Sequence, residues 1–518
     1  MALCCKKTLA ALTAALMLAA PAWAETVLKV VPHADLKVLD PVWTTAFVTR
    51  HHGYMIYDTL FGLTQKGEIK PQLVDTYTAS PDNLHYSFTL REGLKFSDGT
   101  PLTTKDVIAS IKRWGARDNL GAKLLAAAEK LEAKDDRTFT LDFKKPFGMV
   151  LDAFSKPSSI PLFVMPEKVA QTDPFKQITD MTGSGPYMFA ADRYRPGEKV
   201  VYLKNPYYVP RNEPADGTAG GKHVYVDELD WVILRDAQTV ANAIEKGEVD
   251  VVEMVPNEQY SVLKKNPDIQ LLKQSAMLHL NHAIPPFNNP KIAQAALMAI
   301  NQAALQRAQI VHKELWNTCT SIYPCGSLYA SDKTDYFTGK PQFKRAQELL
   351  KEAGYDGTPV VLMLPADMPS LNKYPPVMAE LLRRAGFKVD LQSMDWATLV
   401  TRRTKSSPVS EGGWNGFITF WNQADTFNPL FFAPLTGSGL KGWFGWTDDP
   451  KLEALKDEFV GTSDLAKRKE LAEGIQLRVM DSGVYGMLGE AKPIIALRKN
   501  ISGLVEAPIS VFWGLKKD

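Results

Sequence analysis

The sequence predicts an α/β protein built from more than one domain, and three observations indicate this. The chain has 518 residues, which is more than one hydrophobic core usually supports. Hydrophobic residues make up 45% and charged residues 23% of it, as in ordinary folded proteins. Strand patterns at Val360–Leu364 and Lys388–Gln392 flank a helical pattern at Pro376–Arg384, and such a β-α-β unit favours two parallel strands with the helix packed against them.

The N-terminus has the pattern of a secretory signal peptide over residues 1–24. Lys6 and Lys7 precede an apolar run from Thr8 to Ala20, and Ala22-Trp23-Ala24 has the small-x-small form of a cleavage site. This pattern predicts a mature chain that starts at Glu25. An uncleaved anchor is the alternative, but an anchor needs about 20 apolar residues and this run is shorter.

The predicted mature chain is electrically balanced. Removing residues 1–24 takes away two lysines and no acidic residue, which leaves 58 basic and 58 acidic side chains. This balance argues against a nucleic-acid-binding protein and against a polybasic membrane-surface protein. We therefore expect no nucleic-acid partner.

The four cysteines form two pairs with different implications. Cys4 and Cys5 precede the apolar run, so neither follows it as a lipid-modified cysteine would. Cys319 and Cys325 lie close together in NTCTSIYPCG, and in an oxidising compartment such a pair favours a disulfide. Metal ligation is the alternative, but no second cysteine pair or nearby histidine cluster completes a zinc site.

Apolar alternation predicts the strands of the first third of the chain. Val27–Val31 is a short apolar strand, and a helix is expected across Thr49–Tyr57. Residues 86–90 and 139–143 each alternate between apolar and polar side chains, as half-buried strands require.

A turn and a helix follow the strand at 86–90. Asp98 and Gly99 are the strongest local turn signal in LREGLKFSDGTPLTTKD. Thr103 is expected to cap a helix with Asp106 in its first turn and apolar residues of 107–111 on one face.

The remaining patterns alternate between strands and helices. Residues 229–233 predict a strand and 240–244 a helix that ends at Gly247, while 343–350 predict an amphipathic helix that ends before Gly354. The last elements are expected to be helices at Lys451–Phe459 and Leu465–Met480 and a strand within 492–504 that returns to the first domain.

Several short motifs occur in the order typical of one family. They are LDP after the first strand, YDTLF, a phenylalanine followed by SDGTPLT and a helix that opens with KDV, GSGPY at 183–187, and NPYY at 205–208. Together they resemble the peptide/nickel type of extracytoplasmic solute-binding proteins (family 5, dipeptide/oligopeptide-binding-like), which deliver ligands to ABC importers. The resemblance covers nearly the whole mature chain.

This resemblance implies an α/β, two-lobed periplasmic binding protein fold, class II-like, with an extra domain inserted in the first lobe. It implies capture of a short peptide or peptide-like small molecule between the lobes and delivery to an ABC permease complex in the inner membrane. We expect a periplasmic monomer that performs no chemistry. The implied boundaries are 25–58, 182–278 and 496–518 for the first lobe, 59–181 for the inserted accessory domain, and 279–495 for the second lobe.

The segment FITFWNQADTFNP is the richest source of expected ligand contacts. Peptide-binding relatives carry an aspartate shortly after a tryptophan here, and it holds the ligand's α-ammonium. Asp425 is the nearest match, one residue further from Trp421 than expected. The alternative is a solvated loop acid, or one that caps the turn before Pro429.

The chain departs from the dipeptide binders after the strand at Val360–Leu364. Where they carry an arginine for the ligand carboxylate, this sequence has PADMPS, with Asp367 and no arginine. A buried carboxylate without a cationic partner is costly, so the departure weakens the dipeptide hypothesis. Arg403, beside Arg402, could supply the charge, or the two could form a structural salt-bridging face.

Other expected ligand contacts are aromatic or lie near the first strand. Trp421, Trp443 and Trp446 could stack on ligand side chains, or could belong to the core. Trp43, Thr44 and Thr45 follow the LDP turn, where the backbone of the family approaches the ligand.

The sequence predicts neither a metal nor a cofactor. His51 and His52 are adjacent and point apart on a helix, while His279 and His282 lie in a strand and a loop. A nickel or metal-chelate binder is the alternative, because some relatives bind nickel through a small chelator. G-x-S-x-G, H-E-x-x-H and G-x-G-x-x-G motifs are absent, so the second alternative, a secreted peptide hydrolase, would need a dispersed triad.

Overall fold

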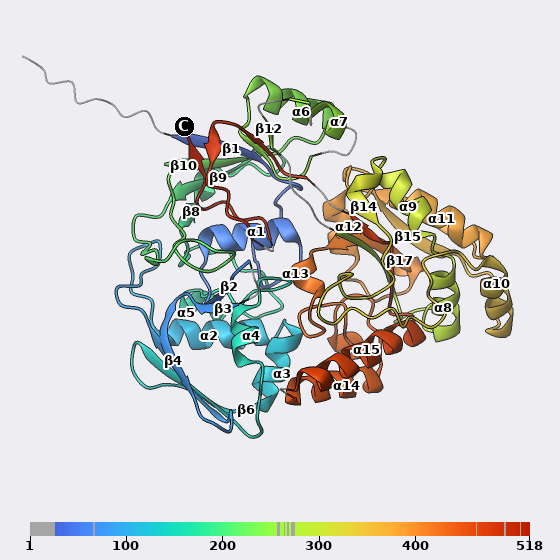
Figure 1. The fold of residues 1–518 in the computed structure, drawn as a ribbon, viewed down its shortest axis with the longest axis horizontal. Coiled ribbons are helices and arrows are strands. Elements are labelled where there is room, and N and C mark those ends of the chain that lie inside the picture. Colours follow the sequence, from blue (N-terminus) through green and yellow to red (C-terminus); the bar gives the residue numbers. More distant parts are fainter. Residues whose placement is uncertain are drawn as a thin grey trace, which may run out of the picture.

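The computed structural model shows two lobes that face each other, one blue to green and the other yellow to red (Figure 1). The predicted signal peptide lies outside the described residues. No helix among the described residues is both long enough and apolar enough to cross a membrane. The structure describes residues 26–65, 68–255, 259–263, 265–266, 269–270, 275–462, 464–491, 494–507 and 509–518.

The first lobe contains a seven-stranded mixed sheet in the order β12-β20-β11-β1-β10-β9-β8. β1 runs parallel to both β10 and β11, whereas β20 pairs antiparallel with β11 and β12. β20 comes from the far end of the chain, so the predicted return strand is confirmed. The strands are β1 (Val27–Val31), β8 (Tyr187–Phe189), β9 (Lys199–Lys204), β10 (Glu228–Val232), β11 (Val251–Val252), β12 (Ile269–Gln270) and β20 (Ala496–Arg498).

Two helices of this lobe bear on the site. α6 (Ala237–Lys246) is capped by Asp236 and ends at Gly247, whose φ of 76° suits a glycine, as predicted. α1 (Phe47–Ile56) is buried along its whole length, including Arg50 and the histidines 51–52. Since buried polar groups need partners, the side chains of α1 must find theirs inside the protein.

A four-stranded antiparallel sheet, β4-β5-β7-β6, lies at the lower end of the same lobe (Figure 1). The predicted alternation is confirmed, since Tyr86, Phe88 and Leu90 point inward and Phe88 stacks on Phe139. The predicted N-cap at Thr103 is also confirmed at the start of α2, where Asp106 joins it in a capping box. The elements are β4 (Val74–Ala79), β5 (His85–Leu90), α2 (Thr104–Gly115), α3 (Asn119–Ala127), β6 (Ala128–Ala133) and β7 (Thr138–Phe143).

The second lobe is built on a five-stranded sheet in the order β16-β15-β17-β13-β18. β15 is parallel to β16 and is joined to it through α11, which confirms the predicted β-α-β unit. Other helices cover this sheet, among them the two predicted late helices α14 and α15. The bounds are β13 (Ser275–Leu280), α8 (Pro290–Met298), α9 (Gln302–Gln309), α10 (Phe343–Glu352), β15 (Val360–Pro365), α11 (Tyr374–Arg384), β16 (Val389–Met394), α12 (Trp396–Arg402), β17 (Gly416–Trp421), α13 (Gln423–Thr426), α14 (Pro450–Gly461), α15 (Leu465–Ser482) and β18 (Tyr485–Met487).

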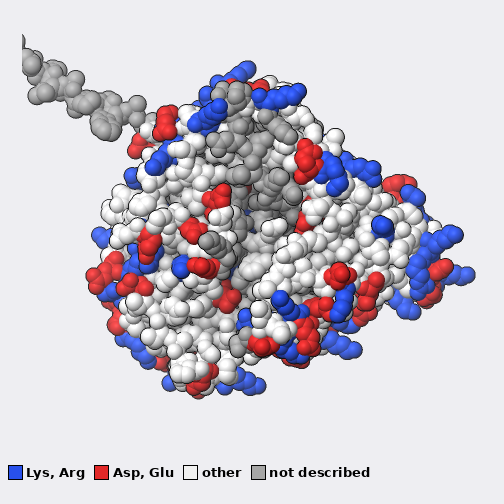
Figure 2. Space-filling view, viewed as in Figure 1, with Lys and Arg blue, Asp and Glu red and all other residues white. Residues whose placement is uncertain are grey.

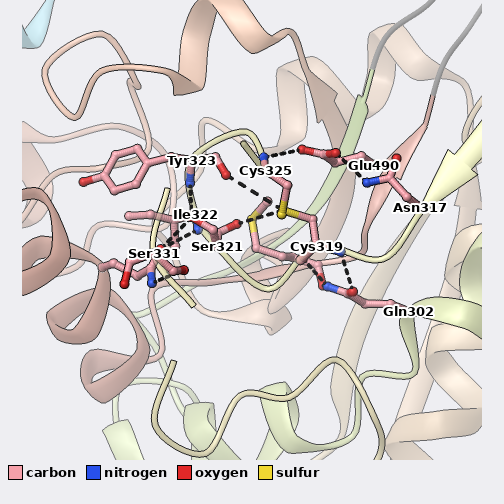
Figure 3. Close-up of a disulfide and its surroundings, with 11 residues drawn as sticks. Gln302, Asn317, Cys319, Ser321, Ile322, Tyr323, Cys325, Ser331 and Glu490 are labelled. Atoms are coloured by element: carbon pink, nitrogen blue, oxygen red, sulfur yellow. Dashed lines mark hydrogen bonds between the residues drawn. A yellow bond between two sulfur atoms is a disulfide. The ribbon is translucent and has the colours of Figure 1, made fainter. Parts of the chain in front are cut away.

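A disulfide joins Cys319 and Cys325 in the second lobe (Figure 3). The Gln302 side chain donates to the carbonyl of Cys319 at 2.6 Å and accepts from its N–H at 3.0 Å. Glu490 accepts from the N–H of Cys325 and from the amide of Asn317. Because both sulfurs are used in the bond, this pair cannot serve as thiolate metal ligands.

Charged side chains of both signs are interspersed over the face seen in Figure 2. No basic stripe of the kind that nucleic-acid-binding proteins carry stands out on that face.

Candidate ligand-binding site

Three cavities meet where the lobes face each other. The outer cavity, of about 120 Å³, lies between Val31–Lys37 and α6 on one side and Asp367–Tyr374 on the other. The C-terminal cavity, of about 390 Å³, lies between α1 and residues 504–512. The inner cavity, of about 20 Å³, is reached from both. His33 and Phe420 line all three.

Arg403 lies in the wall of the inner cavity that the second lobe provides. It follows α12, and only 2% of its surface is exposed. Aromatic rings surround the guanidinium carbon at 5.2 to 5.9 Å from their centroids. They belong to Trp396, Phe417, Trp443 and Phe444.

The Arg403 guanidinium has no acidic partner among the described residues. Its Nε and Nη2 atoms are buried and make no hydrogen bond. Burial lowers the pKa of Arg403 to about 9, with no carboxylate to oppose the shift. The faces of aromatic rings attract a cation but do not neutralise it. The buried charge of Arg403 therefore costs free energy as long as no anion is bound beside it. A planar guanidinium is suited to a carboxylate, which it can hold with two hydrogen bonds.

The opposite wall of the inner cavity carries a hydrogen-bonded cluster on the first lobe. One carboxylate oxygen of Glu253 lies 2.8 Å from Nδ1 of His33 and accepts from its main-chain N–H at 2.9 Å. The other oxygen lies 2.9 Å from Nδ1 of His51. On its far side, Nε2 of His51 lies 2.7 Å from Nη2 of Arg50.

These contacts determine where the protons lie. A guanidinium can only donate, so Nε2 of His51 must accept from Arg50 and the proton of the ring must sit on Nδ1. Burial lowers the pKa of His51 to about 4, which keeps the ring neutral. The two neighbouring histidines hold the pKa of the Glu253 carboxyl well below its usual value despite burial. Glu253 is therefore an anion that is hydrogen-bonded to His33 and lies 2.9 Å from Nδ1 of His51.

The same cluster is where a metal ion would be sought, since three donor atoms lie within 4.8 Å of one another. A metal at Nδ1 of His51 would place the ring proton on Nε2, against a guanidinium that also carries protons there. The contact with Arg50 therefore favours a hydrogen-bonded cluster over a metal site. Sequence reasoning grouped His51 with His52, whereas the structure groups it with His33 and Glu253, which sequence reasoning missed.

Asp425 lies in a different place from the one expected of a ligand contact. It is fully buried at the start of α13, accepts from the N–H of Asn422 at 2.9 Å, and lines none of the three cavities. The hydroxyl of Ser158 accepts a hydrogen bond from the guanidinium of Arg50 and donates one to Asp425. Burial raises the pKa of Asp425, and the charge of Arg50 opposes that rise. Asp425 thus caps a helix and faces Arg50 across the lobe junction.

The other expected residues divide between the cavities and the core. Thr45 and Trp421 line the inner cavity, and Asp367 lines the outer one while it accepts from the N–H of Trp396 at 2.7 Å. Trp443 packs near Arg403 and donates to Thr45 across the junction at 3.3 Å.

Four further expected contacts, Trp43, Thr44, Trp443 and Trp446, line none of the three cavities. Trp43 is half-buried in a turn, Thr44 is buried, and Trp446 belongs to an aromatic core cluster with Trp414. Arg402 donates to the carbonyls of the glycines at 412–413, a structural role like the one weighed for it. The two arginines therefore differ, since Arg402 bonds carbonyls whereas Nε and Nη2 of Arg403 have no hydrogen-bond partner among the described residues.

Sequence comparison shows which known proteins this chain resembles. The model of "Bacterial extracellular solute-binding proteins, family 5 Middle" matches residues 68–443. A probable peptide ABC transporter periplasmic-binding protein, y4tO of Sinorhizobium fredii, is 36% identical over 493 residues, which is 93% of this chain and 92% of that protein. The glutathione-binding protein GsiB of Escherichia coli K12 is 26% identical over 498 residues, 92% of each chain.

Solved structures with the same fold include two with bound ligands. AgaA from A. tumefacien R10, in complex with agropinic acid, has a TM-score of 0.79 at 22% identity, over 95% of this chain and 99% of that one. A dipeptide binding protein from Pseudoalteromonas sp. SM9913, in complex with Met-Leu, has a TM-score of 0.78 at 20% identity, over 95% of this chain and 100% of that one. These likenesses establish the two-lobed fold.

Proposed function

Because the chain belongs to the bacterial extracellular solute-binding proteins of family 5, we propose that it is the substrate-binding component of an ABC importer. Its ligand is a short peptide or peptide-like molecule that carries a carboxylate. The observation that carries this proposal is Arg403, a buried cation that lines the inner cavity and has no acidic partner among the described residues. The name of the y4tO relative supports the peptide class.

The cavities account for how such a protein would close. Both lobes contribute walls to the outer and inner cavities, so a ligand held there touches both lobes only in the closed form. A ligand that binds the closed form better shifts the population toward it. The closed, liganded protein is then the form that docks on the permease.

The compartment and the domain division complete the proposal. The chain works in the periplasm, which the name of the periplasmic relative supports, and it does so as a monomer after cleavage before Glu25. The first lobe comprises 25–58, 182–278 and 496–518, with 59–181 inserted and 279–495 as the second lobe. The seven-stranded sheet takes strands from all three segments of the first lobe, which supports this division, whereas β13 (Ser275–Leu280) of the second lobe's sheet crosses the boundary between 278 and 279.

The chain binds its ligand without transforming it, as the family of solute-binding proteins supports. The wild-type protein incubated with a captured peptide should return it intact by mass spectrometry. Recovery of shortened peptides would instead indicate the secreted hydrolase.

Native mass spectrometry of protein purified from its own periplasm tests the proposal. The wild-type protein should carry a bound anionic ligand, seen as an added mass that is lost on unfolding. The Arg403→Gln variant should show no added mass. Arg402→Gln is the matched control, because its side chain bonds carbonyls of its own lobe, and it should stay loaded. An unchanged bound mass on Arg403→Gln would overturn the role of Arg403, and a metal isotope pattern would favour a chelate binder.

A further inference from the structure

The buried end of the outer cavity is apolar and is built by both lobes. Val31 and Val240 of the first lobe line it, and so do Ile310 and Tyr374 of the second lobe. Each of these four side chains is at most 5% exposed. Only Tyr374 among them carries a polar side-chain atom, and its hydroxyl already donates to Gln306 at 3.1 Å. This end of the cavity therefore offers contact to an apolar group and leaves none of these four side chains in need of a polar partner.

The charged side chains that line the outer cavity lie at its exposed end and already have partners. Arg235 lies 3.6 Å from Asp35, and Lys37 lies 3.7 Å from Asp395. The side chains of Arg235 and Lys37 are 59% and 44% exposed. Asp367 is exposed as well, and it accepts from a main-chain N–H at 2.7 Å. Because water screens exposed charges, the selectivity of the outer cavity comes from its buried apolar end.

The inner cavity limits how much of a ligand can lie beside Arg403. Its volume is about 20 Å³, and one water molecule already needs roughly 10–15 Å³. The inner cavity therefore has room for the ligand carboxylate and little else. The groups next to that carboxylate must lie in the adjoining cavities. The outer cavity adjoins the inner one, since His33, Met368, Trp396 and Phe420 line both.

The backbone and the side chain of the ligand's last residue have different requirements. Both leave from the carbon that carries the carboxylate. Backbone amides need hydrogen-bond partners when they are buried. The C-terminal cavity, of about 390 Å³, is lined by polar side chains that can serve them, among them Gln65, Gln423 and Ser510. The backbone is therefore better placed in the C-terminal cavity, and the buried end of the outer cavity is left to the side chain.

The volume of the outer cavity sets the size of that side chain. An apolar cavity of about 150 Å³ in another protein holds one benzene molecule. At about 120 Å³, the outer cavity suits the four-carbon side chain of leucine better than a larger ring system. A leucine side chain there would contact Val240 of one lobe and Ile310 of the other. Its burial would therefore favour the closed form.

We propose that the outer cavity selects a leucine-sized aliphatic side chain on the carboxyl-terminal residue of the ligand. This inference rests on the proposed function and specifies the ligand as a peptide that ends in leucine or isoleucine. The carboxylate lies on Arg403, the aliphatic side chain in the outer cavity, and the rest of the backbone in the C-terminal cavity.

Three tripeptides test the position and the polarity of the selected side chain. Ala-Ala-Leu and Leu-Ala-Ala have the same composition and charge, but only the first places leucine beside the carboxylate. Ala-Ala-Asn has a polar side chain of similar shape at that position. Titration calorimetry of the wild-type protein should show Ala-Ala-Leu binding about tenfold more tightly, or better, than either of the other two. Equal or tighter binding of either comparison peptide would overturn the inference.

The failure of this inference can be told apart from the failure of the proposed function. If all three tripeptides bind equally, or if Leu-Ala-Ala binds best, the assignment of the outer cavity is wrong and a peptide-binding protein remains. If none of them binds, the inference and the peptide ligand of the proposed function both fail.

The variant Ala237→Leu tests whether the outer cavity holds the side chain. Ala237 is half-buried at the first position of α6 and lines the outer cavity, so a leucine there would occupy part of it. Wild type should prefer Ala-Ala-Leu to Ala-Ala-Ala by about tenfold or more, and in Ala237→Leu this ratio should approach one. The matched control is Gln238→Leu, at an exposed neighbour that lines none of the three cavities, and it should retain the wild-type ratio. A wild-type ratio in Ala237→Leu would overturn the inference. Because both affinities are measured on the same variant, a loss of stability does not imitate the expected result.

Discussion

Two buried arginines lie on the two sides of the cleft, and their surroundings are opposite. Arg50, on the first lobe, bonds Ser158 and His51 and is stabilised by the charges of Asp425 and Glu253. Arg403, on the second lobe, is surrounded by rings, and burial lowers its pKa with no acid to oppose the change. The charge of Arg50 is compensated by groups of the protein, and the charge of Arg403 is the one that the proposed function assigns to a ligand carboxylate.

The difference shows how a binding protein can store affinity in its empty state. Burying a charge without a partner is unfavourable, so the empty protein is less stable than it could be. A ligand carboxylate reduces this unfavourable energy only if it binds next to the Arg403 guanidinium. Arg50 offers no such gain, because its partners are already present.

Exchanging each arginine for methionine tests this comparison and has the largest expected effect. Arg50→Met leaves acids without their cation and should lower the free energy of unfolding by about 3–5 kcal/mol. Arg403→Met removes an unpaired charge and should raise it by about 1–3 kcal/mol, while binding of a carboxylate ligand is lost. Urea unfolding and calorimetry measure both. A larger loss of stability in Arg403→Met than in Arg50→Met would contradict the comparison.

Lowering the pH should destabilise both lobes, because each lobe contains a buried histidine whose pKa is lowered. Burial lowers the pKa of His51 to about 4 and that of His279 to about 3, from 6.5 in the unfolded chain. Between pH 6.5 and 4 the unfolded state therefore binds more protons, so stability is full above pH 6.5 and falls as the pH drops. His279 alone should contribute a loss on the order of 3 kcal/mol at pH 4.

The contribution of the second lobe to this acid sensitivity can be measured separately. His279 accepts from Trp421 at 2.8 Å, and His279→Gln keeps an acceptor there without a titrating group. Urea midpoints of this variant should fall less steeply than those of wild type between pH 7 and 4. An unchanged slope would contradict the assignment. At lower pH the protonation of Glu253, whose pKa is depressed, adds a loss of the same sign.

Asp425→Asn sharpens the comparison by removing one partner of Arg50. Because Asp425 is buried, we expect a loss of about 2 kcal/mol in stability. The preference for a free over an acetylated ammonium should stay as in wild type, since Asp425 lines none of the cavities. Titration calorimetry with a tripeptide and with its N-acetylated form measures that ratio. Loss of the preference with little change in stability would restore Asp425 as the ammonium site.

Local patterns predicted individual strands and helices, because periodicity and turn chemistry are properties of short segments, whereas the two-lobed arrangement was implied by the resemblance to the family. The capping box at Thr103 and the β-α-β unit near Val360 depend only on neighbours in sequence, and the structure has both. The site depends on distant residues instead. His33 and Glu253 are 220 residues apart, and each alone is an unremarkable residue beside a strand. The sequence suggested Arg403 as a candidate for binding a carboxylate. It is distinguished by the lack of an acidic neighbour among the described residues, and a sequence does not show which side chains are neighbours in space.

The disulfide provides the smallest expected effect and a control for the others. Replacing Cys319 and Cys325 with serine opens a short loop, since the two are six positions apart, and should cost at most about 2 kcal/mol. The bond lies against α9 and Glu490, and neither cysteine lines the three cavities at the lobe junction. Ligand affinity should therefore be unchanged while the thermal midpoint falls. If affinity fell as well, a general loss of stability would be enough to weaken binding, and the losses expected for Arg403 variants could no longer be assigned to the missing charge.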